Sequence, residues 1–528
     1  MTPFSIWSSV LGIVLSSPLI FTLCRGGNVL VYPIEGSHWV NMNILIEALH
    51  ARGHNVTIVR SDKSWYIKEK SPHYSTVTVP VEESLDETFI TEIITKGIDS
   101  QSGKYSMINI LSFHVQLIES FSRAHRIVSK MVEAIFKDNM LTKRLQESQY
   151  DLVLADPCWG GGTLLAKYLN LPLVYNVRWL PVGEGHSAIA PSPLSYIPIT
   201  GSGFSDKMSF TERIRNMLFY LFTLFHDVYI VRPHYAALCH DYLGPDVDFY
   251  SLMQAADLWL MRVDFVFEFP RPTMPNAVYI GGFQCKPAKP LPQDLEEFVQ
   301  SSGEHGIIIM SLGTFVGQLP YDLTEEIAAA FAQLPQKIIW RHTGERPETL
   351  GNNTLLVKWM PQNDLLGHPK TRAFVAHGGT NGVQEAIYHG MPVLGIPLFF
   401  DQYDNLLRLK IRGGAQILEI GTLNKDSFLQ ALQEVLHEPS YRMNMQRLSR
   451  LHLDQPMKPL DRAMFWIEFV MRHKGAAHLR TESYRMPWYA YHSVDVIMLL
   501  LAAVFVILLT AVAIIRFLCC RTRKIKSD

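Results

Sequence analysis

The sequence predicts an α/β protein with two Rossmann-like lobes that face each other across a cleft, followed by a transmembrane helix near the carboxyl end. Three observations predict this fold class. Two consecutive series of buried strands and amphipathic helices run along the chain. Between them lies CKPAKPLP (residues 285–292), whose three prolines are typical of a linker. Beyond the second series, the uncharged run Val496–Ile515 is long enough to span a bilayer.

The first series opens with a βαβ unit. We predict a strand in GNVLVYP, a helix in NMNILIEALHARGH and a second strand in NVTIVRS. Residues 107–140 have helical spacing, YDLVLA and PLVYNVR are predicted strands, and GGGTLLAKYLNL between them is a predicted helix. The aromatic run 218–225 is too short to span a membrane, and we predict that it belongs to the core, with contact with the membrane surface as the alternative.

The second series contains strands in GIIIMSLGT, KIIWRHTG, TLLVKWMP, FVA, PVLGIPLFF and AQILEIG, with a helix over residues 323–334. Residues 465–471 predict a helix that packs back on the lobes before the span. The predicted organisation is a signal peptide (1–24), an amino-terminal lobe (25–285), a linker (286–292), a carboxyl-terminal lobe (293–450), return helices and membrane approach (451–492), a transmembrane helix (494–515) and a basic tail (516–528).

Composition excludes several classes of function. The chain has 528 residues, 48% of them hydrophobic, which is enough for two cores, and its net charge of -1 gives no reason to expect a nucleic-acid partner. The six cysteines lack zinc-ligand spacing. At most one bridge among Cys158, Cys239 and Cys285 is expected, and the sequence does not choose it. Asp246 and Asp248 match a metal-binding DxD pattern but follow Gly-Pro, so we predict a solvated turn, with no metal site and no bound cofactor.

The two ends of the chain predict a location. Residues 10–23 form an apolar run of signal-peptide length, with an uncleaved anchor as the alternative because no basic residue precedes it. The basic tail predicts a single-pass type I membrane protein with luminal lobes and a cytoplasmic tail. Lys524 and Lys526 resemble the dilysine retrieval signal of endoplasmic-reticulum membrane proteins. Asn55 and Asn352 begin N-glycosylation sequons.

The segment FVAHGGTNGVQEAIYHG carries the strongest chemical signal. A strand ends at His377, and Gly378 to Gly382 lead into a helix whose first N–H groups are free to bind a phosphate. Thr380 and Asn381 are placed to cap this helix or to donate to phosphate, and Glu385 lies about one turn further on, where it can accept from ribose hydroxyls. Such a cradle predicts a nucleotide-sugar site.

Polar residues follow other strands of the second series. Asp401 and Gln402 come after PVLGIPLFF and are brought to the same edge of the sheet as the phosphate cradle. Ser311 and Gly313 follow GIIIM and can offer a hydroxyl and backbone amides to a diphosphate. Trp359, next to the strand TLLV, suits stacking on a planar base.

A candidate general base lies in the first lobe. His38 follows the first strand, and Asp156 follows the strand DLVLA, which we expect to run parallel to the first and to end at the same edge. An imidazole takes a proton at neutral pH, and a carboxylate on its other nitrogen fixes the tautomer. The pair therefore predicts activation of an acceptor hydroxyl.

These motifs resemble the signature of the UDP-glycosyltransferases, and most closely the membrane-bound UDP-glucuronosyltransferases of animals, over nearly the whole chain. The resemblance implies a GT-B fold, UDP-glucuronate as co-substrate, and inverting transfer to the hydroxyl groups of small lipophilic acceptors. It assigns His38 as base with Asp156, Arg341 near the nucleotide, Trp359 and Gln362 to uracil, His377 with Gly379 to phosphate, Glu385 to ribose, Asp401 and Gln402 to the sugar, and Arg262 to the glucuronate carboxylate.

Alternatives remain open at this level. The same motifs suit UDP-glucose, UDP-galactose or UDP-N-acetylglucosamine as donor. The non-enzymatic alternative is a catalytically silent membrane-anchored partner of active relatives. Trp179 to Pro198 and the aromatic run beginning at Leu218 are expected to wall the acceptor pocket. The resemblance is also compatible with homo- or hetero-oligomers.

Overall fold

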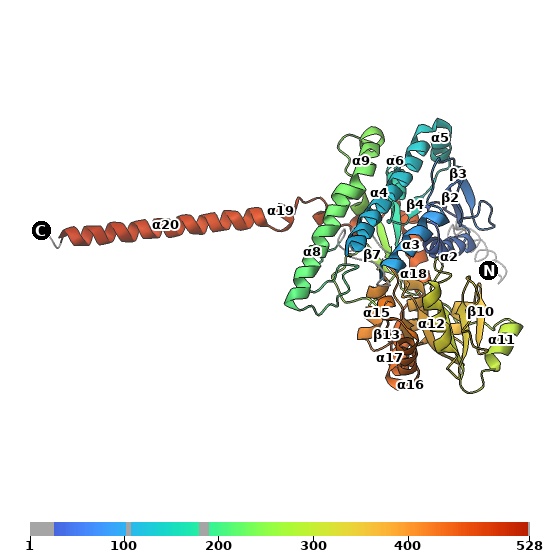
Figure 1. Ribbon diagram of the computed structural model, residues 1–528. Coiled ribbons are helices and arrows are strands. Elements are labelled where there is room, and N and C mark those ends of the chain that lie inside the picture. The colour runs from blue at the N-terminus through green and yellow to red at the C-terminus, as the bar shows by residue number, and fades with distance from the viewer. Residues whose placement is uncertain (1–25, 102–106, 179–189, 526–528) are drawn as a thin grey trace, which may run out of the picture. The chain divides into compact units, whose positions relative to one another are not determined.

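Two parallel sheets with helices on their faces form the two lobes of the protein (Figure 1). The structure is a computed structural model and describes residues 26–101, 107–178 and 190–525. The chain up to Ala477 forms one compact unit that contains both sheets, and the chain from His478 onward forms a second. The predicted signal peptide, part of the predicted acceptor wall (179–189) and Lys526 lie outside the described residues.

The first sheet has seven parallel strands in the order β3-β2-β1-β4-β5-β6-β7. Its strands are β1 (Asn28–Tyr32), β2 (Asn55–Ser61), β3 (Ser75–Val79), β4 (Leu152–Ala155), β5 (Leu173–Val177), β6 (Leu258–Met261) and β7 (Ala277–Tyr279). β1 and β4 are neighbours, with Tyr32 opposite Ala155, so both end at the same edge as predicted. The sequence reading missed β3, β6 and β7, although LWLM in β6 is an apolar run.

The helices of the first lobe follow the predicted pattern with two differences. They are α2 (Ser37–Ala51), α3 (Glu87–Gln101), α4 (Met107–Lys137), α5 (Asn139–Glu147), α6 (Gly161–Tyr168), α8 (Phe210–His226), α9 (Arg232–Leu238) and α10 (Phe249–Gln254), with π-helical turns Asp227–Val231 and Cys239–Leu243. The first helix begins at Ser37, earlier than predicted. The long helix ends at Lys137 because Asp138 caps the next one, accepting from the N–H groups of Met140 and Leu141.

The second sheet has six parallel strands in the order β10-β9-β8-β11-β12-β13. Its strands are β8 (Ile307–Ser311), β9 (Lys337–Arg341), β10 (Thr354–Val357), β11 (Thr371–Ala376), β12 (Val393–Gly395) and β13 (Ala415–Ile417). The helices are α11 (Gln293–Gln300), α12 (Tyr321–Phe331), α13 (Gln362–Leu366), α14 (Thr380–His389), α15 (Gln402–Ile411), α16 (Lys425–His437) and α17 (Pro439–Leu453). Two apolar clusters cover its two faces, because Ile308 belongs to one and its neighbour Ile309 to the other.

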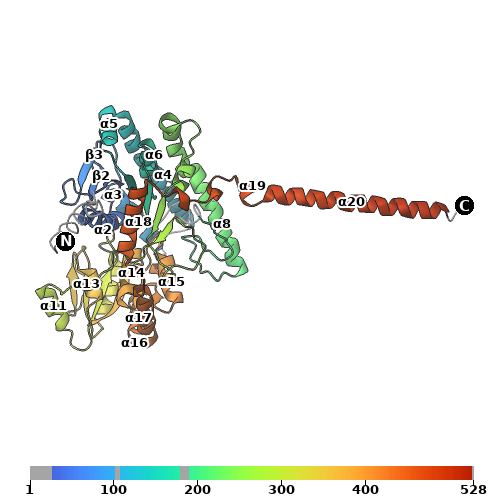
Figure 2. The same ribbon diagram turned by 180° about the vertical axis from the view of Figure 1, so that it is seen from behind.

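The helix α18 (Pro459–His473) returns to the first lobe and packs on α2 (Figure 2). Arg52, at the end of α2, pairs with Glu468 and with Asp461, each at 3.1 Å. After α18, the backbone N–H of Ala476 donates to Asp257 at 2.7 Å. The predicted packing of this region back on the lobes is confirmed.

The aromatic helix α8 is not part of the core, so that prediction was wrong. Ser209 and Glu212 form a capping box at its start, and the residue that ties it to the lobe is the buried Asn216, which donates to the carbonyls of Leu194 and Ile197. Its apolar side chains point outward, with Leu218 60% exposed. The exposed face favours the alternative, contact with a membrane surface.

Smaller predictions are also decided by the structure. No helix or strand interrupts the proline-rich segment between β7 and α11. The predicted turn is present, because the N–H of Val247 donates to the carbonyl of Gly244. Asp248 then caps α10 by accepting from the N–H of Ser251 at 2.8 Å. The three candidate bridge-forming thiols are all unpaired: Cys158, Cys239 and Cys285.

The second unit contains the predicted membrane span. Its helix α20 runs over Val494–Ile525 and includes the apolar stretch Val494–Cys519, which is long enough to cross a bilayer. A short helix, α19 (Trp488–Tyr491), precedes it. In the part of the chain that the structure describes, α20 is the one helix with this length and composition.

Candidate functional site

His38 and Asp156 lie together at the carboxyl edge of the first sheet. β1 ends at Tyr32, and the turn that follows places His38 in the first turn of α2. Gly36 in this turn has a φ of 68°, and a Cβ there would collide with the ring of Phe315 from the second lobe. Asp156 directly follows β4. The Nδ1 atom of His38 is 2.6 Å from a carboxylate oxygen of Asp156.

The surroundings of this pair suit a general base. Asp156 is buried, and its other oxygen accepts from the N–H of Cys158 at 3.0 Å. Because the carboxylate accepts, Nδ1 of His38 carries the proton and Nε2 is free to take one. Burial lowers the pKa of His38, which Asp156 partly offsets, so the ring is neutral at neutral pH.

The turn that was predicted to be a phosphate cradle lies where β11 meets α14. Gly378 has a φ of 91°, and a Cβ there would lie 2.6 Å from the carbonyl oxygen of Gln402, so the turn requires glycine. The helix begins after Gly379 with no side chain capping it. Neither Thr380 nor Asn381 therefore caps the helix as suggested, and its first N–H groups have no side-chain partner at this end.

Both candidate caps are engaged elsewhere. Thr380 donates to Asp401 at 3.2 Å, and Asn381 accepts from Asn41 of α2 at 2.7 Å. Burial lowers the pKa of His377 to about 4, so this ring is neutral and can serve a phosphate only as a neutral donor.

A second loop, after β8, lies beside the cradle. The N–H of Gly313 approaches the hydroxyl of Ser311 at 3.4 Å. Arg341, at the end of β9, donates to the carbonyl of Gly313 at 2.6 Å and to that of Val316 at 3.2 Å. Arg341 therefore holds the loop that follows β8 in place.

The predicted base and ribose contacts are close together. Trp359 lies in the loop between β10 and α13 and is 75% exposed. Gln362 begins α13, and its amide donates to Glu385 of α14 at 2.6 Å. Burial raises the pKa of Glu385 to about 7.

The predicted sugar contacts begin α15. Asp401 accepts from Thr380 and from Asn405, the latter at 2.9 Å. The side-chain oxygen of Gln402 accepts from the N–H groups of Leu398 and Phe399, so its side-chain NH2 group is the part left for a ligand.

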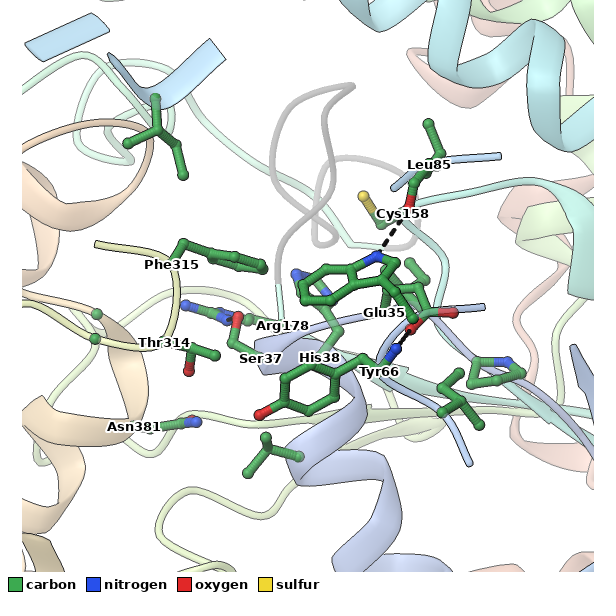
Figure 3. Close-up of a pocket in the computed structure, with 18 of the residues that line it drawn as sticks. Glu35, Ser37, His38, Tyr66, Leu85, Cys158, Arg178, Thr314, Phe315 and Asn381 are labelled. Carbon is green, nitrogen blue, oxygen red and sulfur yellow. Dashed lines mark hydrogen bonds between the residues drawn. The ribbon is translucent and has the colours of Figure 1, made fainter. Parts of the chain in front are cut away.

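One cavity of about 720 Å³ brings most of these residues together. It is lined by both lobes, and the predicted residues on its wall are His38, Ser311, Gly313, Arg341, Trp359, Gln362, His377, Gly379, Asn381, Glu385, Asp401 and Gln402. Figure 3 shows His38 facing this space, with Thr314 and Asn381 of the second lobe across from it. Three predicted residues do not line the cavity: Asp156 behind His38, Thr380 behind Asp401, and Arg262, which is 2% exposed.

The part of the cavity wall that α3 and α4 form is mainly apolar. It includes Phe89, Phe121, Ile127, Val128 and Met131, on α3 and α4. These helices were not predicted to contribute to the acceptor wall. Such a wall favours a hydrophobic ligand.

Sequence reasoning missed the contacts that hold the two lobes together. Gln384 of α14 accepts from the N–H of Gly282 at 2.8 Å and donates to the carbonyl of Arg262. Arg408 of α15 pairs with the buried Glu268 at 2.9 Å. No local pattern marks these residues, because their partners lie more than 100 positions away.

Arg178 was also missed, although a signal was present. It follows β5 at the same sheet edge as Asp156, and it lines the cavity. One guanidinium nitrogen donates to the Ser37 hydroxyl at 2.6 Å. The rule that selected Asp156, a polar residue directly after a buried strand, also selects Arg178.

The raised pKa of the Glu385 carboxyl group predicts a pH-dependent affinity for a ribose-bearing donor. Its raised pKa means that the carboxylate, the better acceptor for ribose hydroxyls, is lost as the pH falls through about 7. We expect the KM for a UDP-sugar to rise several-fold between pH 8 and pH 6. In Glu385→Gln the KM is expected to be higher at pH 8 and nearly flat over this range. Initial rates with varied UDP-sugar check this, and an equally steep rise in the variant would contradict it.

The family model described as "UDP-glucoronosyl and UDP-glucosyl transferase" matches residues 27–527. The chain is 45% identical to UDP-glucuronosyltransferase 2B1 of Rattus norvegicus over 501 residues, and 44% identical to UDP-glucuronosyltransferase 2B15 of Homo sapiens over 503 residues. Each alignment covers 94% of both chains.

Solved structures show the same fold at low sequence identity. The glycosyltransferase VinC in complex with dTDP has a TM-score of 0.56 at 18% identity, covering 84% of this chain and 100% of that one. The calicheamicin glycosyltransferase CalG4 has a TM-score of 0.55 at 17% identity, covering 85% and 99%. Together with the two parallel sheets, these likenesses confirm the predicted GT-B fold.

Proposed function

Since the chain belongs to the family of UDP-glucuronosyl and UDP-glucosyl transferases, it is a UDP-glycosyltransferase, and we propose that it transfers glucuronic acid to hydroxyl groups of small hydrophobic acceptors. One observation carries the proposal. The candidate general base His38, hydrogen-bonded to Asp156, lies across one cavity from the phosphate cradle of the other lobe. An acceptor activated by the first lobe therefore meets a donor held by the second.

The proposed reaction is a single displacement. Nε2 of His38 removes the proton from the acceptor hydroxyl, and the oxygen attacks the anomeric carbon on the face opposite UDP. The bond between that carbon and the diphosphate oxygen breaks, so an α-linked donor gives a β-linked product. The N–H groups at the start of α14 stabilise the negative charge that develops on the diphosphate.

The choice of substrates is supported by two observations. The relatives that align over 94% of their length carry the name UDP-glucuronosyltransferase, which favours glucuronate over glucose, galactose or N-acetylglucosamine. The apolar wall from α3 and α4 favours lipophilic acceptors.

A donor panel tests this function. Microsomes that contain the protein are given a set of phenols with each UDP-sugar in turn. We expect turnover with UDP-glucuronate at least tenfold faster than with UDP-glucose, UDP-galactose or UDP-N-acetylglucosamine, and a β-linked product. Faster turnover with another UDP-sugar would mean that glucuronate is not the transferred sugar. UDP binding without turnover of any donor would favour the non-catalytic alternative.

The location is part of the proposal. The apolar helix α20 fits a membrane anchor, and the basic residues after it favour a cytoplasmic tail with luminal lobes. Lys524 and Lys526 favour retrieval to the endoplasmic reticulum. Replacing both with serine is expected to bring the protein to the cell surface, as immunofluorescence of unpermeabilised cells would show. Unchanged reticular staining would mean that the tail is not the retrieval signal.

A further inference from the structure

Arg178 places a positive charge on the wall of the catalytic cavity. It lines the cavity directly after β5, and its hydrogen bond with Ser37, the neighbour of His38, fixes one guanidinium nitrogen (Figure 3). Among the described residues, no carboxylate lies within ion-pair distance of Arg178; its charge is therefore not matched by them. A partly exposed guanidinium in such a position suits an anionic ligand.

Arg262 adds a second positive charge behind this wall. It follows β6, the strand beside β5, and its side chain is buried. Within the part of the chain that the structure describes, neither of its terminal guanidinium nitrogens has a hydrogen-bond partner. Arg178 lowers the pKa of both Arg262 and His38, after the larger effect of burial, which places it near both groups. Of these two cations Arg178 is the one that lines the cavity, whereas the carboxylates of Asp156 and Asp401 lie close enough to Arg262 to offset part of its charge.

The geometry of the reaction decides which part of the donor meets the guanidinium of Arg178. The nucleotide contacts Trp359, Gln362 and Glu385 all belong to the second lobe, as does the phosphate cradle. The anomeric carbon must approach an acceptor oxygen held by His38, so the sugar ring is the part of the donor that lies against the wall of Ser37, His38 and Arg178.

We propose that Arg178, with Arg262 behind it, forms the subsite that binds the carboxylate of the transferred glucuronate. This inference rests on the proposed function and moves the direct contact from Arg262, the residue expected from the sequence, to Arg178. The planar guanidinium matches a carboxylate in a charge-assisted pair. A neutral hexose has a hydroxymethyl group at the same position and leaves the charge unpaired, so the subsite discriminates between donors.

The test measures donor discrimination in the full-length protein in microsomes. Arg178→Gln removes the charge, and Arg178→Lys keeps the charge but lacks the planar guanidinium that can donate two parallel hydrogen bonds. Lys63→Gln removes a charge from another part of the same cavity wall. The readouts are kcat/KM for UDP-glucuronate, the inhibition constant of UDP-glucose as a competing ligand, and the inhibition constant of UDP. We expect Arg178→Gln to lower kcat/KM for UDP-glucuronate at least tenfold, with both inhibition constants changed less than twofold.

Controls separate this inference from its alternatives. Arg178→Lys is expected to retain part of the preference for UDP-glucuronate, and Lys63→Gln all of it. If Arg178→Gln weakens UDP, UDP-glucose and UDP-glucuronate equally, Arg178 binds the diphosphate and the inference is wrong. If kcat falls without a change in the affinity for UDP-glucuronate relative to UDP-glucose, Arg178 acts only through Ser37 and His38. A wild-type protein that does not use UDP-glucuronate would instead contradict the proposed function.

Discussion

Replacing His38 with alanine is expected to lower kcat with hydroxyl acceptors by about 10²- to 10⁴-fold, the usual contribution of a general base. Its Nε2 is the free basic nitrogen, because Nδ1 is held by Asp156 at 2.6 Å. Because we propose that the other lobe binds the donor, the inhibition constant of UDP is expected to stay within about twofold. Steady-state rates with a phenol acceptor measure the first quantity, and inhibition by UDP measures the second.

Asp156→Asn tests the same pair without removing the base. The variant keeps the size of the side chain but loses the charge that orients the imidazole and stabilises its protonated form. We expect a loss of kcat approaching that of His38→Ala, and the double variant is expected to be little worse than either one because the two residues act as a unit. His305→Ala, at an exposed histidine that does not line the cavity, is the matched control. Full activity in His38→Ala would exclude the assigned base.

Trp359→Ala is expected to raise the KM for every UDP-sugar by roughly 5- to 150-fold, because stacking of an aromatic ring on a base is worth about 1–3 kcal/mol. The side chain is 75% exposed in the absence of a ligand, so its removal leaves the core intact and the melting temperature is expected to change little. We expect stacking on the uracil base to be equally strong in the ground state and the transition state, so kcat should be preserved. Kinetics with varied donor, together with a thermal melt, check both expectations.

Two variants sharpen the Trp359 prediction. Trp359→Phe retains a ring and is expected to recover most of the affinity. Trp65→Ala removes an indole from the first-lobe wall of the same cavity, where its N–H donates to the carbonyl of Leu85. That control should change the KM for the acceptor rather than for the donor. A Trp359→Ala variant with altered acceptor KM and unchanged donor KM would place the nucleotide elsewhere.

The pairing of His38 with Asp156 could be predicted from sequence although 118 positions separate them. Buried strands have local signatures, and parallel strands that are neighbours end at the same edge, so residues just after them converge. The same reasoning placed His377, Glu385 and Asp401 on one cavity wall. These predictions needed only the order of elements and the rule for parallel sheets.

Other features depended on which faces meet in three dimensions. The apolar helix α8 was predicted to be buried, yet the side chain that attaches it to the lobe is Asn216, and its apolar face is exposed. Arg262 was predicted to touch the donor, yet it lies behind the cavity wall. In both cases the residue type is the same whether the side chain faces inward or outward, so periodicity gives no answer.

The sequence by itself determined the two lobes, the membrane helix, the phosphate cradle and the candidate base, because each depends on short segments with their own spacing of apolar, glycine and polar residues. The tertiary structure alone decided that Asn41 of one lobe holds Asn381 of the other, that Gln384 ties the lobes together, and that Arg178, rather than Arg262, lies on the cavity wall. The physical reason is that hydrogen bonding, burial and charge depend on the distances between segments that are remote along the chain.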